Sequence, residues 1–358
     1  MKTFHCTSCG SLVFFENVKC LTCGHALAFD SGRLDILTLK PADEGLWRDA
    51  SASDSEPDAA YRLCANYANH AVCNWAVPAD STESLCRSCG LTHTIPILDD
   101  AANRLAWAKL EGAKRRMVYS ILRLGLPLAS KVQDPAAGLE FQFLSDAGTT
   151  GGDQSRVLTG HDDGVITINV AEADDVYRES QRLHQNEPYR TLLGHFRHEI
   201  GHYYWDRLIR PSSRLEEFRR VFGDERADYG EAVRRHYAEG APADWEEQYV
   251  SAYATTHPWE DWAESWAHVM HMADALETAH ALGVQVSPKR RDEPALTLSS
   301  APTDGGGENF DELVRGWTSL TYVLNNLTRG LGLADAYPFV LSAPVIEKLR
   351  FVWASMLP

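Results

Sequence analysis

The chain has 358 residues, 44% of them hydrophobic, so it can bury a sizeable core and should contain two or three structural units. Aspartate and glutamate number 50 against 34 lysines and arginines, and the net charge of −16 argues against binding to a nucleic-acid backbone. No stretch is apolar and uncharged for the ~18 residues that a membrane span needs, and no export signal is evident. We therefore expect a cytoplasmic protein without membrane contact.

Two Cys-x2-Cys pairs lie near the start of the sequence, Cys6 with Cys9 and Cys20 with Cys23. A glycine follows each pair, as in tight turns that present two thiolates each, and four thiolates complete a closed tetrahedral zinc site. A redox-active pair is the alternative, but two paired motifs without a surrounding βαβ pattern fit a metal better. We therefore predict a zinc ribbon over residues 1–40.

The next segment, residues 41–60, is rich in proline, serine, aspartate and alanine, and it predicts a connector. Residues 61–100 follow with four more cysteines, of which only the last two have the Cys-x2-Cys spacing. These cysteines are Cys64, Cys73, Cys86 and Cys89. We predict a second four-cysteine structural zinc site, with His70 and His93 as substitutes if one cysteine is free. Both zinc sites would fold segments too small to bury a core of their own.

Hydrophobic periodicity divides the rest of the chain, residues 101–358, into a few strands followed by many helices. Alternating or β-branched patterns predict strands at 139–146 and 165–170. Helices are expected at about 99–128, 173–184, 188–209, 213–222, 224–239, 243–254, 258–282, 309–331 and 343–356. This order of elements indicates an α+β fold.

The helix expected at 188–209 contains His198-Glu199-Ile200-Gly201-His202, an H-E-x-x-H pattern. Residues four apart lie on one face of a helix, so both histidines can bind one metal ion. Glu199 lies beside them and can take a proton from a zinc-activated water molecule. The alternative is a histidine-rich helix without a metal.

A second helix, at 258–282, places acidic residues among three tryptophans. Glu260 and Glu264 share one face of this helix, and Glu264 also shares a face with His268. Carboxylates in such apolar surroundings need a partner, and a metal ion is one. An exposed acidic strip at the first turn is the alternative reading. The residues alone leave open which glutamate would be the third ligand.

Several segments together resemble a bacterial family of zinc-binding metallopeptidases that carry an N-terminal zinc ribbon. These segments are CTSCG, CLTCG, YRLCANYANHAVCNW, LCRSCGLTHTIP, HEIGHYYWDRL, FGDERADY and HPWEDWAESWAH, which run from residue 6 to about 272. The resemblance implies a mostly helical, zincin-like metallopeptidase domain over residues 101–358, preceded by the two zinc modules. It adds little about the substrate.

A wider resemblance, to gluzincins of the lethal-factor-like branch, implies individual roles. That branch has a tyrosine seven residues before the ligand glutamate, and here Tyr253 precedes Glu260 by seven. The resemblance makes His198, His202 and Glu260 the ligands, and Tyr253 the residue that stabilises the oxyanion. Glu264 would orient a ligand histidine by a hydrogen bond to the ring nitrogen that does not bind the metal. Asp261 and Trp262 depart from the pattern of the branch, which leaves the register open by one helical turn.

The sequence thus predicts a zinc-dependent peptidase with Glu199 as general base and three zinc ions per chain, one catalytic and two structural. Its expected partners are a peptide or protein substrate and a protein bound through the zinc modules. The alternative is a zinc-ribbon adaptor with an inactive peptidase-like domain. All the residues that the chemistry needs are present, which argues against the adaptor.

Overall fold

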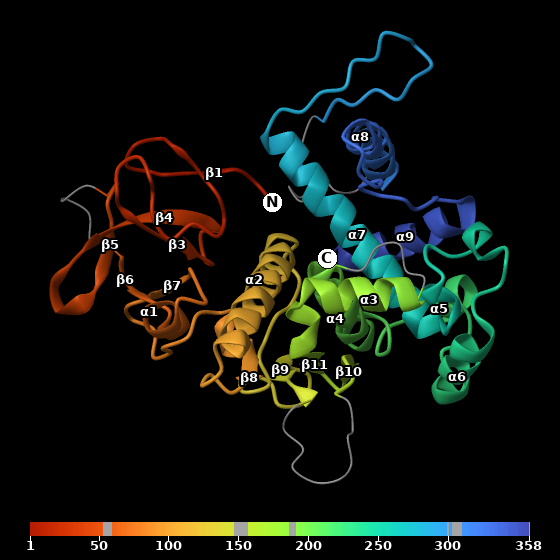
Figure 1. Ribbon diagram of the computed structural model, residues 1–358, viewed down its shortest axis with the longest axis horizontal. Coiled ribbons are helices and arrows are strands. Elements are labelled where there is room, and N and C mark those ends of the chain that lie inside the picture. The colour runs from red at the N-terminus through yellow and green to blue at the C-terminus, as the bar shows by residue number, and fades with distance from the viewer. Residues whose placement is uncertain (53–58, 147–156, 186–190, 299–300, 303–309, 358) are drawn as a thin grey trace. The chain divides into compact units, whose positions relative to one another are not determined.

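The computed structural model describes residues 1–52, 59–146, 157–185, 191–298, 301–302 and 310–357, and it mixes helices with three small sheets (Figure 1). The chain divides into two units. One, here called the sheet unit, comprises Lys2–Thr159 and Val165–Asp174. The other, here called the helical unit, comprises Met1, Gly160–Gly164 and Asp175–Pro358. Among the described residues, no helix combines the length and the apolar character that crossing a membrane requires.

The sheet unit begins with a short antiparallel hairpin and continues into a five-stranded antiparallel sheet whose strands follow chain order. The hairpin pairs β1 (Phe4–His5) with β2 (Leu12–Val13), and the larger sheet consists of β3 (Ala26–Asp30), β4 (Asp35–Pro41), β5 (Trp47–Asp49), β6 (Ala60–Leu63) and β7 (Ala76–Pro78). Inward-facing side chains of four of these strands form a small core, namely Ala28, Leu37, Leu39, Tyr61 and Ala76.

The segment 41–60, expected as a connector, is partly sheet. Within it lies β5, which pairs with β4 on one side and with β6 on the other. Trp47 pairs with Tyr61 in this ladder, so two aromatic side chains stabilise a strand of only three residues. The acidic, serine-rich centre of the segment, residues 53–58, lies outside the described residues. Composition averaged over twenty residues conceals so short a strand.

An aromatic cluster joins the ribbon to the rest of the sheet unit. Phe4 and Phe15 from the ribbon contact Phe29 of β3 and Tyr119 of the long helix α2 (Ala101–Arg123), with ring centroids 5.0–6.3 Å apart. Trp75 completes the cluster, 4.7 Å from Phe29. All five rings are buried, and edge-to-face contacts of this kind add to the stabilisation that burial gives.

The two strands predicted at 139–146 and 165–170 are present in the sheet unit as β9 (Glu140–Leu144) and β11 (Val165–Asn169). They pair in parallel, and β8 (Thr92–Thr94) pairs in parallel with β9 on its other side. A short helix, α1 (Ala65–His70), lies between Cys64 and Cys73. The alternation of buried and partly exposed residues along β9 matches its expected period of two.

The helical unit contains seven α-helices within its described residues, together with the short strand β10 (Gly160–Asp162). The helices are α3 (Asp175–Gln185), α4 (Leu192–Leu208), α5 (Leu215–Phe222), α6 (Tyr229–Glu239), α7 (Pro258–Ala281), α8 (Phe310–Gly330) and α9 (Ala343–Met356). Thr191 caps α4 by accepting a hydrogen bond from the backbone N–H of Gly194. The two helices that carry the predicted site, α4 and α7, both lie in this unit.

Helices α4 and α7 pack against each other at very short range, because Gly201 has no side chain (Figure 1). A Cβ atom at this position would lie 3.0 Å from the Cα of Ala263 and 3.1 Å from the Cβ of Trp266. Trp262 donates from its indole N–H to the carbonyl oxygen of Gly201 at 2.8 Å, and Tyr204 stacks on Trp266. The glycine of the histidine motif thus permits the contact that brings the two helices together.

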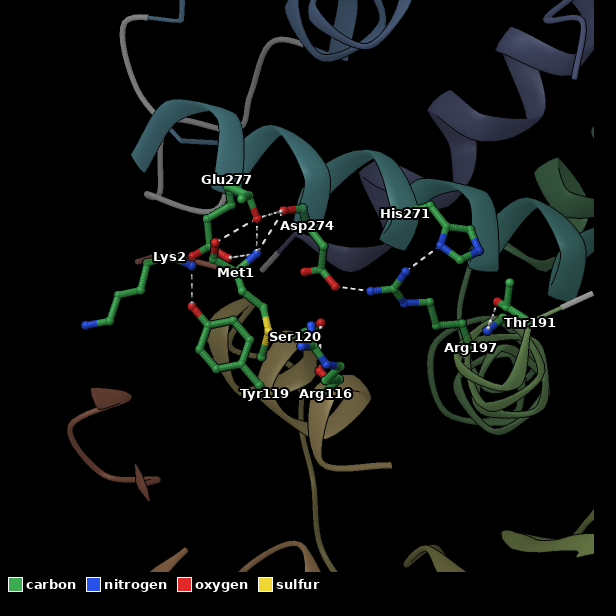
Figure 2. A network of polar contacts seen from close by, with 12 residues as sticks. Met1, Lys2, Arg116, Tyr119, Ser120, Thr191, Arg197, His271, Asp274 and Glu277 are labelled. Atoms are coloured by element: carbon green, nitrogen blue, oxygen red, sulfur yellow. Dashed lines mark hydrogen bonds and ion pairs between the residues drawn. The ribbon is translucent and has the colours of Figure 1, made fainter. Parts of the chain in front are cut away.

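A polar network lies further along the same pair of helices (Figure 2). Arg197 of α4 donates to Nδ1 of His271 and to the carboxylate of Asp274, both on α7. The amino group of Met1 donates to the carbonyl oxygen of Asp274 and lies 3.1 Å from the Glu277 carboxylate. Because guanidinium groups only donate, His271 accepts through Nδ1 and therefore has its proton on Nε2 when neutral.

Residues 243–254, expected as a helix, form two short 3-10 turns instead, Trp245–Glu247 and Tyr253–Thr255. Side chains form hydrogen bonds with backbone groups that would be paired with each other in a continuous helix. Lys348 donates to the carbonyl oxygen of Gln248, and the hydroxyl of Ser251 accepts from the N–H of Ala254. Such bonds between side chains and the backbone compete with the helical ladder.

Candidate metal centre

Three residues predicted as ligands, His198 and His202 of α4 and Glu260 of α7, converge in the helical unit. Oε2 of Glu260 lies 2.9 Å from Nε2 of His198 and 3.4 Å from Nε2 of His202, and the two nitrogens are 3.2 Å apart. All three side chains are buried, Glu260 to 1% exposure. One ion could contact all three atoms at once.

The outer nitrogen of His198 is held by a second carboxylate. Nδ1 lies 2.6 Å from Oε1 of Glu264, and Oε2 of Glu264 accepts a 2.6 Å hydrogen bond from the hydroxyl of Ser251. An ionised carboxylate only accepts, so Nδ1 carries the proton in the neutral ring and Nε2 presents a lone pair toward Glu260 and His202. Burial raises the pKa of Glu264, but its hydrogen bonds to His198 and Ser251 and the nearby charges of His198 and His268 together lower that pKa to about 2.

The Nε2 lone pair of His198 and an oxygen of Glu260 therefore face each other in a buried site, with Nε2 of His202 beside them. Two such acceptors repel each other unless a proton or a metal ion lies between them. Burial alone would lower the pKa of His198, but its hydrogen bonds to Glu260 and Glu264 raise it well above the ordinary value. The site thus favours positive charge at this point. Two imidazoles and one carboxylate are a donor set that suits zinc and leaves a fourth position open.

Glu199 follows His198 in α4, and its carboxyl group is buried beside the cluster. Its Oε2 atom has no hydrogen-bond partner among the described residues. Burial raises its pKa and the nearby Glu260 raises it further, while the two histidines act in the opposite direction. A buried carboxylate with an unused oxygen next to a metal site is placed to exchange protons there.

Tyr253 lies near the site, in the 3-10 turn that precedes α7. Its ring centroid is 5.8 Å from that of His198. Burial raises its pKa well above the ordinary value, and the charge of Glu260 raises it further. Its hydroxyl therefore keeps its proton and can act as a hydrogen-bond donor.

The alternative register, with Glu264 among the ligand atoms and His268 behind it, does not match these positions. Glu264 contacts the outer nitrogen of His198 rather than Nε2. The Nδ1 atom of His268 lies 2.6 Å from the hydroxyl of Tyr337, and its ring packs against Phe339. The two residues that depart from the lethal-factor-like pattern, Asp261 and Trp262, each have a partner in the structure. Asp261 forms a buried ion pair with Lys348 at 2.6 Å, and Trp262 packs on α4 as described above.

Sequence reasoning missed several neighbours of the site. The hydroxyl of Tyr229 donates to Oε1 of Glu260 at 2.8 Å, and the ring centroid of Trp259 lies 3.9 Å from that of His202. The ring centroid of His161, a residue of β10 in the same unit, lies 6.2 Å from that of His202. The segment FGDERADY, which ends at Tyr229, is the only signal that the sequence offers for one of them, and the start of an ordinary helix explains it equally well.

The first four-cysteine set forms one cluster in the sheet unit, as predicted from its spacing. The sulfurs of Cys6 and Cys23 are 3.5 Å apart, and those of Cys9 and Cys20 are 3.6 Å apart. These separations are too long for disulfides and close to the edge of about 3.8 Å expected for four sulfurs around zinc. Cys9 and Cys23 are exposed, so this cluster lies at the surface.

The second set, Cys64, Cys73, Cys86 and Cys89, also converges, and all four residues are buried. Backbone N–H groups point at the sulfurs: Cys86 donates to Cys64 at 3.3 Å, and Cys89 donates to Cys86 at 3.4 Å. The substitutes His70 and His93 are not members of this cluster. His70 packs on Trp107, and His93 is exposed.

Comparison with known proteins agrees with this arrangement of sites. Residues 103–355 match the family model described as "Putative zinc-binding metallo-peptidase", and residues 3–100 match one described as "zinc-ribbon domain". The uncharacterized protein Mb2598c of Mycobacterium bovis and the uncharacterized proteins MT2644 and Rv2568c of Mycobacterium tuberculosis are each 45% identical over 353 residues, 98% of this chain and 94% of theirs. No solved structure matches the chain at a significant level. Since the peptidase model spans more than half of the sequence, the chain belongs to the family of putative zinc-binding metallo-peptidases.

Proposed function

We propose that the chain is a zinc-dependent peptidase with a zincin-like, gluzincin-type site, in which His198, His202 and Glu260 bind the metal and Glu199 is the general base. One observation carries the proposal: a glutamate oxygen and two imidazole nitrogens converge in a buried site, with a further buried carboxylate beside them. The peptidase family to which the chain belongs supports the same reaction class.

A zinc ion bound by these residues would supply Lewis acidity and lower the pKa of a water molecule. Glu199 would accept a proton from the attacking water and pass it to the leaving amine of the peptide. Burial raises the pKa of Glu199, which moves the carboxyl group toward the range where it can both accept and return a proton. Glu264 would hold His198 in the tautomer that presents Nε2 inward.

Tyr253 is proposed to donate a hydrogen bond to the carbonyl oxygen of the peptide as negative charge develops there. Its neutral hydroxyl and the position of its ring, 5.8 Å from that of His198, support this role. The substrate would be a peptide or protein whose scissile carbonyl lies between the metal, Glu199 and Tyr253. The two four-cysteine modules would stabilise the sheet unit and recruit a protein partner.

The test is Glu199→Gln, which removes the base and leaves every proposed ligand in place. We expect the variant to retain the zinc of the parent and to lose hydrolysis of a diverse peptide library by several orders of magnitude. The matched control is Glu246→Gln, because Glu246 is exposed and lies outside the site. Equal cleavage by parent and Glu199→Gln would contradict the proposal. Absence of cleavage by both, across diverse libraries, would favour an adaptor with an inactive domain.

A further inference from the structure

Tyr229 is the first residue of α6 and reaches the predicted metal site from outside α4 and α7. The residue is 41% exposed, yet its hydroxyl lies 2.8 Å from Oε1 of the buried Glu260. A carboxylate accepts and does not donate, so the tyrosine is the donor in this bond. The contact joins residues 31 positions apart in the sequence.

The two oxygens of Glu260 consequently have different surroundings. Oε1 is occupied by Tyr229, whereas Oε2 faces the Nε2 atoms of His198 and His202 at 2.9 and 3.4 Å. A carboxylate free to rotate can offer a metal either one oxygen or both. A hydrogen bond to one oxygen favours coordination through the other alone.

We propose that Tyr229 is a positioning residue that restricts Glu260 to single-oxygen ligation of the catalytic zinc and so keeps a coordination position open. The proposal rests on the proposed function, since it requires a metal at this site. Ligation through one oxygen gives three protein ligands and leaves the fourth position to water or substrate, whereas ligation through both oxygens would crowd that position.

The segment 223–228 holds Tyr229 in place. Gly223 has a φ of +104°, and a Cβ atom there would come within 3.3 Å of the Cγ of Pro258, so the segment turns sharply against the start of α7. Arg219 donates two hydrogen bonds to the carboxylate of Glu225, at 3.0 and 2.6 Å. This part of FGDERADY is therefore fixed to the end of α5 on one side and approaches α7 on the other.

His257 links the same segment to the first turn of α7. Its Nδ1 accepts from the N–H of Trp259 at 3.1 Å, so Nε2 carries the proton and donates to the carbonyl oxygen of Ala227, also at 3.1 Å. The ring of Tyr229 packs edge-on against both His257 and Trp259. These contacts place the Tyr229 ring independently of its hydroxyl, so Tyr229→Phe should remove the hydrogen bond and preserve the packing.

The experiment compares Tyr229→Phe with the parent and with Tyr322→Phe, a tyrosine of α8 with a similar exposed fraction of 49%. A chelator is used to empty the open site, which is then refilled with cobalt(II) while zinc stays in the four-cysteine clusters. We expect Tyr229→Phe to bind cobalt 10–100-fold more weakly in chelator competition, because the loss of a group that hydrogen-bonds to a metal ligand typically weakens metal binding by this factor. We also expect weaker visible absorption bands, because a second carboxylate oxygen raises the coordination number. Tyr322→Phe should match the parent.

Glu260→Ala separates this inference from the proposed function. If Glu260→Ala binds as much cobalt as the parent at this site, the metal site itself is wrong. If Glu260→Ala loses the metal while Tyr229→Phe keeps the parent's affinity and spectrum, the positioning role is overturned and the proposed function survives. Retention of zinc in both four-cysteine clusters and an unchanged far-ultraviolet circular dichroism spectrum show that each variant is folded. If Tyr229→Phe does not fold, Tyr229→Trp is measured in the same way, because it keeps a large ring but places no hydroxyl at Glu260.

Discussion

Nδ1 of His198 lies 2.6 Å from Oε1 of Glu264, while Nε2 of the same ring lies 2.9 Å from Oε2 of Glu260. Each nitrogen of one histidine therefore has its own carboxylate. The partner at Nδ1 fixes the tautomer, and the partner at Nε2 lies where a metal ion would be shared. Because Glu260 and Glu264 are one helical turn apart on α7, a single helix supplies both.

The first prediction distinguishes the two glutamates. Glu260→Ala should abolish tight metal binding at the site, because a ligand is lost. Glu264→Ala should weaken it 10–100-fold, because only the orientation of His198 is lost. Zinc affinity of the purified variants, measured by chelator competition, is the readout. Glu264→Gln is the control, since its amide oxygen can still accept from His198 and should restore much of the affinity. Equal losses for both alanine variants would contradict the assignment.

The sequence predicts the convergence of the histidines well, because spacing along one helix determines it. The distinction between Glu260 and Glu264 depends on the crossing of α4 and α7, which the residues alone leave open and only the resemblance addresses. The sequence does not single out Tyr229 or Ser251, because each contacts a glutamate of α7 from a separate segment, 31 and 13 residues earlier in the chain. Loop conformation leaves no periodic pattern in the sequence.

The fold was predictable to a similar degree. Long helices such as α2, α7 and α9 follow from their apolar periodicity and end within a few residues of the expected positions. The three-residue strand β5 and the two 3-10 turns within 243–254 were not predicted. Cross-strand pairing stabilises β5, and side-chain hydrogen bonds to the backbone stabilise the two turns. Neither therefore depends on a hydrophobic pattern in its own segment.

The second prediction concerns metal content. The folded chain should contain three zinc ions, one in the His198–His202–Glu260 site and one in each four-cysteine cluster. A chelator should remove the first of these before the others, because only that site has an open position. The buried cluster of Cys64, Cys73, Cys86 and Cys89 should release its zinc last. Elemental analysis during timed chelation tests the order, and one zinc per folded chain would rule out this layout.

The third prediction concerns a buried ion pair beside the second cysteine cluster. Lys114 and Glu111 of α2 are both fully buried, with Nζ 2.9 Å from the carboxylate, and Oε2 of Glu111 is 3.8 Å from the sulfur of Cys89. Lys114→Met should destabilise the protein by about 3–5 kcal/mol, because Glu111 would stay buried without its counter-charge. The double variant Glu111→Leu, Lys114→Met should recover most of that loss.

Urea unfolding, with its midpoint and slope, measures these variants. Lys109→Met on the same helix is the control, because it removes an ammonium group that is not paired with Glu111. The prediction fails if Lys114→Met unfolds at the parent's midpoint, or if the double variant is no more stable than the single one. Either result would show that Glu111 does not depend on Lys114.

The fourth prediction concerns His268, which lies on α7 one turn beyond Glu264. Burial lowers its pKa from 6.5 to about 4, although the charge of Glu264 acts to raise it. It faces the hydroxyl of Tyr337 at 2.6 Å, and the ring of His271 is 6.0 Å away. The folded protein therefore holds His268 neutral at a pH where the unfolded chain has it protonated.

The sign of the effect follows from linkage. A histidine whose pKa is lower in the folded state contributes stability above pH 6.5 and loses it as the pH falls from 6.5 toward 4. The full loss is about 3 kcal/mol, from roughly 2.5 pKa units at 1.36 kcal/mol each. His268→Gln removes the titrating group and keeps a polar partner for Tyr337. Urea unfolding of parent and variant between pH 7 and pH 4 should show a steeper decline for the parent, and parallel declines would show that His268 is not the group responsible.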